Sequence, residues 1–218
     1  ADLAFGFAVQ NLLWGAVSPV AGLLAERFGT VRVLLVGAVL YGLGMVLAAI
    51  AQDNMLFFIG NALLVGIGVG ATTFPIVLAA VGQKFPAHKR TLALGIASAG
   101  GSLGQFGYAF ILGKISPVIG WSDTFMWVAG STLVVFALAW LLAESKQLRE
   151  ERREAQITSP TRLFDWQAIG KAIRVPEYQL LNIGFFVCGF HVAFITVHMA
   201  GFVNFCGLPS SVASNSIA

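Results

Sequence analysis

A series of long apolar runs with short polar connections constrains this sequence more than any other feature. A helix needs roughly 17 to 25 mainly apolar residues to cross the hydrocarbon core of a bilayer. Six runs satisfy this requirement: Leu3–Ala25, Val33–Ala51, Met55–Val81, Leu92–Gly113, Thr124–Ala143 and Tyr178–Phe205. Charged residues make up only 11% of the chain, against about 25% in soluble domains. The sequence therefore predicts an all-α, polytopic membrane helical bundle.

The basic residues fall in alternate connections between these runs. The first, third and fifth connections hold twelve of the thirteen Lys and Arg residues, and the remaining one is Lys114 in the fourth. Basic connections stay in the cytoplasm, so we expect residue 1 to lie outside. A nucleic-acid-binding face is excluded, because the basic residues alternate with spans instead of forming one surface.

The chain is expected to divide into three parts. Residues 1–143 would hold five spans of an N-terminal bundle, residues 144–177 a cytoplasmic loop, and residues 178–218 the first span of a C-terminal bundle with the start of the next. Within the loop, we expect a solvated helix over 144–154. Apolar residues then recur at helical spacing from Leu163 to Ile173, which predicts an amphipathic helix on the membrane surface. The chain opens at Ala1 without a signal-peptide pattern, and we interpret it as a fragment truncated at both ends.

Polar residues recur along one face of several spans. Such stripes can line a hydrated pathway or form hydrogen bonds between helices worth about 0.6–2 kcal/mol each. Both interpretations stay open for the candidate pathway residues, which are Asn11, Trp14, Asn61, Ser102, Gln105 and Tyr108.

Glycines four residues apart form a second pattern. Gly66 with Gly70, and Gly100 with Gly104, would let helix backbones approach closely. We expect these four residues to pack helices, and a close, smooth contact could also let one helix rock against another.

The last apolar run contains two histidines seven residues apart. His191 and His198 lie two turns apart on one helical face and could belong to a proton relay or bind a carboxylate. Alternatively, both are neutral rings bonded to neighbouring helices. Cys188 and Cys206 are too far apart on one helix for a disulfide. No paired Cys/His spacing predicts a metal site, and no cofactor is expected.

The first connection resembles the signature loop of the major facilitator superfamily. It reads GLLAERFGTVR, and Gly22, Glu26, Arg27, Gly29 and Arg32 match the pattern of glycines, acid and bases. The acid is Glu where Asp is commoner. The resemblance implies that these residues form the cytoplasmic gate, where charges at helix ends lock the closed state.

Later segments resemble the monocarboxylate transporter and oxalate/formate antiporter branch of that superfamily. They are GIGVGATTFP (66–75), TLALGIASAGGSLGQF (91–106) and FFVCGFHVAFITVHMAGF (185–202). The resemblance implies that the six runs are family helices two through seven. It also implies that the charged residues that bind the anion lie mainly in helices outside this chain.

Together these features predict a secondary active transporter in the cell membrane, and not an enzyme. The expected cargo is a small organic anion, such as a monocarboxylate or oxalate, moved by proton symport or exchange through alternating access. A drug or sugar transporter of the same superfamily is the alternative. A seven-helix receptor is a remote one, since no lysine lies in a span to form a Schiff base and the short charged hinge would be unexplained.

Overall fold

A computed structural model describes residues 2–141, 150, 154, 166–207 and 212 of the chain. Its elements are helices, with no strand in the described part, and the predicted all-α membrane bundle is confirmed. In chain order they are α1 (Asp2–Phe28), α2 (Thr30–Ile50), α3 (Asn54–Phe58), the π-helix η1 (Ile59–Leu64), α4 (Val65–Ala71), α5 (Phe74–Lys84), α6 (Ala87–Ser131), α7 (Leu133–Leu141), α9 (Trp166–Ile173) and α10 (Pro176–Phe205).

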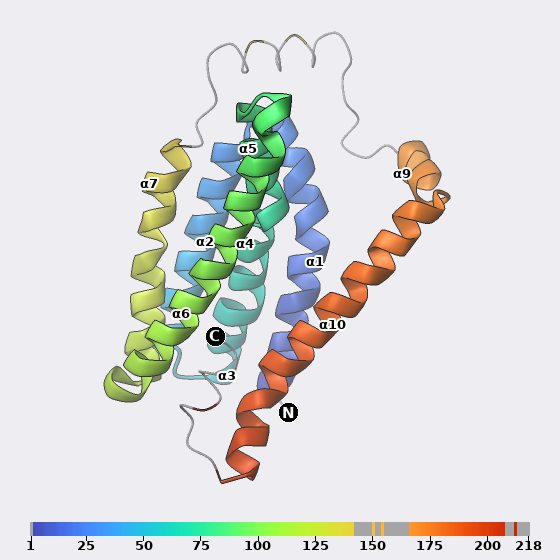
Figure 1. The fold of residues 1–218 in the computed structure, drawn as a ribbon. Helices are drawn as coiled ribbons and strands as arrows, with labels where there is room; N and C mark the ends of the chain where they lie inside the picture. Colours follow the sequence, from blue (N-terminus) through green and yellow to red (C-terminus); the bar gives the residue numbers. More distant parts are fainter. Residues whose placement is uncertain (1, 142–149, 151–153, 155–165, 208–211, 213–218) are drawn as a thin grey trace.

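Five helical stretches of the described residues are long and apolar enough to cross a membrane. One of them covers 53 residues, from Ala87 to Ala139, which would measure about 80 Å as a straight helix. Gly120 divides it, because its φ of 83° and ψ of 172° are not helical. The chain reverses at this break, so the first part of α6 descends and its last part returns together with α7 (Figure 1). The stretch thus supplies two crossings, and the connection expected over 114–123 is reduced to a turn at Gly120.

The third apolar run is not one continuous helix, contrary to the expectation for Met55–Val81. A π-helical turn occupies Ile59–Leu64, and the helix stops at Ala71 before α5 begins at Phe74. Pro75 explains the second interruption, since proline has no N–H to donate and its ring clashes with the carbonyl four residues earlier. Thr72 closes the end of α4, and its hydroxyl donates to the Gly68 carbonyl at 3.0 Å.

Packing centres on α2, which contacts α1, η1, α4, α6 and α7. The buried positions are mainly small or β-branched, as in the cluster formed by Ala21, Ala25, Val33, Leu34, Ala71 and Ile76. Small side chains let membrane helices approach closely, and this packing replaces the hydrophobic drive that is missing in lipid. Ser122 ties the Gly120 turn to the bundle by donating to the Ala49 carbonyl at 2.6 Å.

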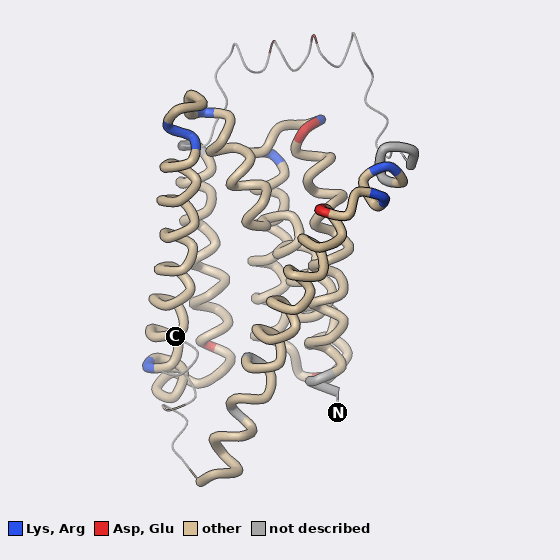
Figure 2. The backbone as a smooth tube through the Cα atoms, turned by 45° about the vertical axis from the view of Figure 1, so that its right-hand side comes forward, with Lys and Arg blue, Asp and Glu red and all other residues tan. Residues whose placement is uncertain are grey.

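Charged residues gather at the two ends of the bundle, and its middle is almost free of them (Figure 2). The α1–α2 and α5–α6 connections and α9 lie at one end, and α3 and the Gly120 turn lie at the other (Figure 1). From the distribution of bases, we expect the end with the α1–α2 connection to be the cytoplasmic one.

Towards the C-terminus, α10 packs against α9 and makes little contact with the other helices. Most of its described side chains are exposed. The expected helix over 144–154 and the start of a further span after Cys206 fall almost wholly outside the described residues.

Candidate functional site

A single residue, Gly29, separates α1 from α2 at the end of the bundle that we expect to be cytoplasmic. Its φ of 97° and ψ of 139° lie outside the regions open to L-residues, which explains why glycine stands there. The Gly29 amide donates to the Ala25 carbonyl at 2.9 Å, and the Val33 amide donates to the Gly29 carbonyl at 3.4 Å. Both helix ends are therefore held by the turn itself, and the connection is shorter than the one expected from the sequence between Ala25 and Val33.

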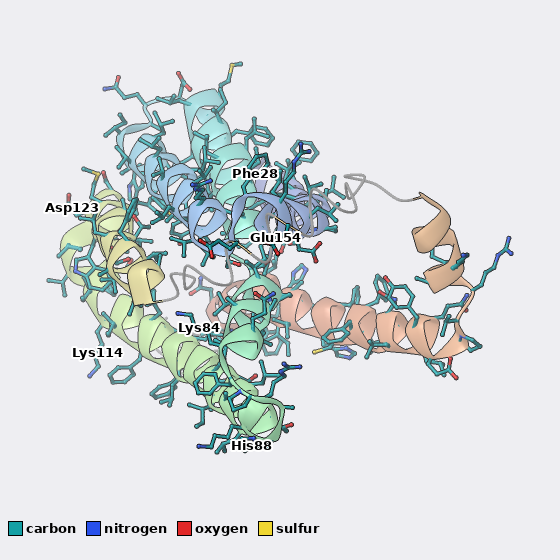
Figure 3. All side chains as sticks on the ribbon, turned by 90° about the horizontal axis from the view of Figure 1, so that it is seen from above. Phe28, Lys84, His88, Lys114, Asp123 and Glu154 are labelled. Carbon is teal, nitrogen blue, oxygen red and sulfur yellow. The ribbon has the colours of Figure 1, made fainter. Side chains whose placement is uncertain are left out.

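The charged residues of this turn are accessible at the helix ends. Glu26, Arg27 and Arg32 are all exposed. The Arg27 guanidinium lies 5.5 Å from the centroid of the Phe28 ring, and its place in the last turn of α1 suits the negative end of the helix dipole. Within the described residues, neither Glu26 nor Arg32 makes an ion pair. Figure 3 views this end and shows Phe28 at the end of α1 and His88 near the start of α6, on different sides of the bundle.

A cavity of about 450 Å³ extends between α1 and α5 beside the turn. Gly22 and Glu26 line it together with Ser18, Thr30, Thr73 and Gln83, among other residues. Ser18 uses its hydroxyl to donate to the Trp14 carbonyl at 2.6 Å. Two of the five residues of the expected gate motif thus border a cavity that extends along α1 from the α1–α2 turn as far as Gly15.

A second cavity of about 450 Å³ lies among α2, α4, α6 and α7. Hydroxyl groups dominate its polar lining, which comprises Tyr41, Thr72, Tyr108, Ser131 and Thr132. The hydroxyls of Tyr108 and Ser131 are hydrogen-bonded to each other, and the Tyr108 ring packs against Trp127 with centroids 5.9 Å apart. No charged residue lines this cavity.

Of the expected pathway residues, Tyr108 is the one that lines this second cavity. Sequence reasoning missed Tyr41, Ser131 and Thr132 there. The available signals were a lone phenol in the otherwise apolar second run and a Ser-Thr pair directly after Gly130.

The other pathway candidates lie apart from both cavities. The Asn11 amide donates to the Phe7 carbonyl of its own helix at 2.8 Å. Trp14, Ser102 and Gln105 are exposed, and Asn61 is half-buried in η1. None of these five residues lines either cavity, and their place in a pathway stays a prediction.

Both histidines of the last run lie exposed on α10. His191 Nδ1 is 2.8 Å from the Val187 carbonyl, and the His198 ring lies 4.9 Å from the Phe194 ring. Their surroundings within the described chain are therefore the backbone and aromatic rings of α10. Cys188 and Cys206 are free and exposed.

The glycine pairs differ in their surroundings. A Cβ on Gly66 would lie 3.0 Å from the Gln10 carbonyl oxygen, and one on Gly70 would lie 2.7 Å from Val17 Cβ, so both glycines bring α4 against α1. A Cβ on Gly100 or Gly104 would meet no atom within 4 Å. The packing role of the second pair remains a prediction.

Comparison with known proteins gives one family and several relatives. The family model described as Major Facilitator Superfamily matches residues 2–218. The uncharacterized MFS-type transporter YhjX of Escherichia coli is 30% identical over 186 residues, which cover 84% of this chain and 44% of that protein. Monocarboxylate transporter 13 of Bos taurus is 30% identical over 193 residues, covering 87% and 42% respectively. Monocarboxylate transporter 11 of Homo sapiens is 33% identical over 130 residues, covering 60% and 26%. The chain spans less than half the length of these curated relatives.

Proposed function

The chain belongs to the Major Facilitator Superfamily, and from this we propose that the complete protein containing it is a secondary active transporter of small organic anions. The superfamily that the first connection indicated is thereby confirmed, as is the expectation of an integral, multi-pass membrane protein. Its relatives are named as transporters and not as enzymes.

The observation that carries the choice of cargo is the similarity to two monocarboxylate transporters at 30–33% identity. For one of them the similarity extends over 87% of this chain. Symport with protons or exchange of one anion for another would drive transport, and two helical bundles would rock about a site between them.

The position of the α1–α2 turn supports a role as the cytoplasmic gate. Gly29 holds two long helices in a tight turn, and Glu26 and Gly22 face the cavity beside it. Charges at adjoining helix ends favour one packing of these ends over another by a modest free energy. Such a turn can therefore stabilise a closed state that is still able to open.

The hydroxyl-lined cavity favours a second candidate function. With five hydroxyl-bearing residues and no charge in its lining, it suits a neutral solute that forms hydrogen bonds, such as a sugar.

Uptake by reconstituted liposomes separates the two functions. The complete protein would be supplied with labelled lactate, formate, oxalate or glucose, with and without an inward proton gradient. We expect at least one anion to accumulate above protein-free liposomes and glucose not to do so. Accumulation of glucose alone would favour the second function, and indifference to every anion would contradict the first.

A further inference from the structure

The corner between α9 and α10 combines bases, exposed apolar side chains and a cavity. Only Arg174 and Val175 separate the two helices. Lys171, in the last turn of α9, and Arg174 are both exposed. They are three residues apart, and the Arg174 amide donates to the Lys171 carbonyl at 3.1 Å. One turn therefore presents both cations.

Side-chain hydrogen bonds fix the geometry of this corner. The Gln179 amide group donates to the Ile173 carbonyl at 2.6 Å, which links α10 back to the end of α9. One turn later, the Asn182 amide group donates to the Tyr178 carbonyl at 2.7 Å. These residues and Ile183 line an open cavity of about 510 Å³. These hydrogen bonds give the corner a defined geometry.

The surroundings of the cavity change from charged to apolar along the chain. Three apolar or aromatic side chains near the two cations are exposed: Ile173 to 52%, Tyr178 to 45% and Leu180 to 69%. Ile173 lies between the two cations in the sequence, and the other two follow them. In membrane proteins, tyrosine side chains are enriched at the depth of the lipid headgroups. Glu177, in the first turn of α10, is the acid in this neighbourhood, and the two cations outnumber it.

The corner also lies at the membrane face where anionic lipids are found. Figures 1 and 2 place α9 and its bases at the same end as the α1–α2 and α5–α6 connections. The distribution of bases makes this end cytoplasmic, and the cytoplasmic leaflet carries the anionic lipids that attract Lys and Arg next to spans.

From this arrangement we propose that the α9–α10 corner binds the headgroup of an anionic phospholipid. Lys171 and Arg174 contact the phosphate, the cavity lined by Tyr178, Gln179 and Asn182 receives the glycerol part, and the exposed apolar residues contact the acyl chains. The site is independent of the transported solute. It holds the linker between the expected two bundles at a fixed depth in the membrane.

Native mass spectrometry of the complete protein tests this proposal. The protein would be placed in nanodiscs of phosphatidylcholine that contain increasing fractions of phosphatidylglycerol. The number of phosphatidylglycerol molecules that stay bound after the protein is released from the nanodisc would be counted. Each cation near an anionic surface contributes about a fivefold factor, so we expect K171Q/R174Q to weaken retention of one lipid by roughly 25-fold.

Two further variants isolate the site from general surface charge. K89Q/R90Q removes two exposed cations from the start of α6 at the same membrane face, and we expect it to retain this lipid like the wild type. Ile183→Trp keeps all charges but fills the cavity, and we expect it to lower retention. Equal loss in both double variants, an unaffected Ile183→Trp protein, or full displacement of the lipid by free glycerol phosphate would each overturn the proposal.

Discussion

At the scale of single residues, glycines with positive φ occupy two reversals of the bundle. Gly29 joins α1 to α2, and Gly120 joins the descending and ascending parts of the α6–α7 stretch. The need for glycine at the first position was visible in the motif around it. Gly120 gave no comparable signal, because a lone glycine in a glycine-rich membrane chain does not mark a turn.

Replacing Gly29 with alanine tests whether its backbone conformation is required. A Cβ at φ 97° is strained, and we expect the free energy of unfolding to fall by about 1–3 kcal/mol. Thermal unfolding of the purified protein in detergent measures the change. Gly22→Ala is the matched control, because a Cβ there would meet no atom within 4 Å. Equal stability of Gly29→Ala and wild type would show that the turn adopts another conformation.

The gate proposal predicts a specific effect of Arg27. A favourable charge at a helix end is worth 0.3–1 kcal/mol, so Arg27→Ala should shift the balance of closed and open states about two- to fivefold and lower initial uptake by a similar factor. Lys114→Ala is the control, since this cation lies near the opposite end of the bundle. Its ammonium group is 4.3 Å from the centroid of the Phe110 ring. Unchanged uptake by Arg27→Ala, with normal insertion of both variants, would remove Arg27 from the gate.

At the scale of elements, periodicity and length predicted most spans, but not how they are interrupted. The apolar run over 55–81 contained Pro75, yet a proline alone does not say whether a span bends or breaks. Here the hydroxyl of Thr72 bonds back to the Gly68 carbonyl and ends α4, and α5 starts two residues later. The π-helix at Ile59–Leu64 depends on packing, because Gly60 lies against Gly44 and Ala48 of α2.

The contact between α2 and α4 depends on glycines that leave no room for a methyl group. A Cβ on Gly68 would lie 2.5 Å from the Tyr41 backbone nitrogen. We therefore expect Gly68→Ala to force the helices apart and to lower the free energy of unfolding by about 1–3 kcal/mol. Gly104→Ala, with open space around its Cβ, should leave thermal unfolding unchanged, and a similar effect of both variants would contradict this packing.

At the scale of the whole molecule, a motif within one stretch of sequence is easier to recognise than a cavity shared by several helices. The expected gate motif lies within eleven consecutive residues. The hydroxyl cavity unites Tyr41 of α2, Thr72 at the end of α4, and Tyr108 and Ser131 from the two arms of α6 on either side of Gly120. Their proximity depends on helix rotations that periodicity in one chain does not determine. The expected roles of His191 and His198 remain predictions for the same reason.

The orientation of the bundle predicts which connections meet the cytoplasm. With Cys188 and Cys206 replaced by serine, we expect Asp53→Cys to react with a membrane-impermeant maleimide in intact cells. His88→Cys should react only after permeabilisation, because the α5–α6 connection lies at the basic end. The reverse labelling pattern would invert the topology.

Counterflow tests the central proposal, alternating access for a small organic anion, most directly. Liposomes with the complete protein would be loaded with unlabelled lactate or oxalate and diluted into a trace of the same labelled anion. We predict that the labelled anion accumulates transiently above its equilibrium level inside the liposomes. Each unlabelled anion that leaves turns the binding site to the outside, where a labelled anion can then bind. A monotonic rise to equilibrium, as through a channel, or no entry of either anion beyond protein-free liposomes would contradict it.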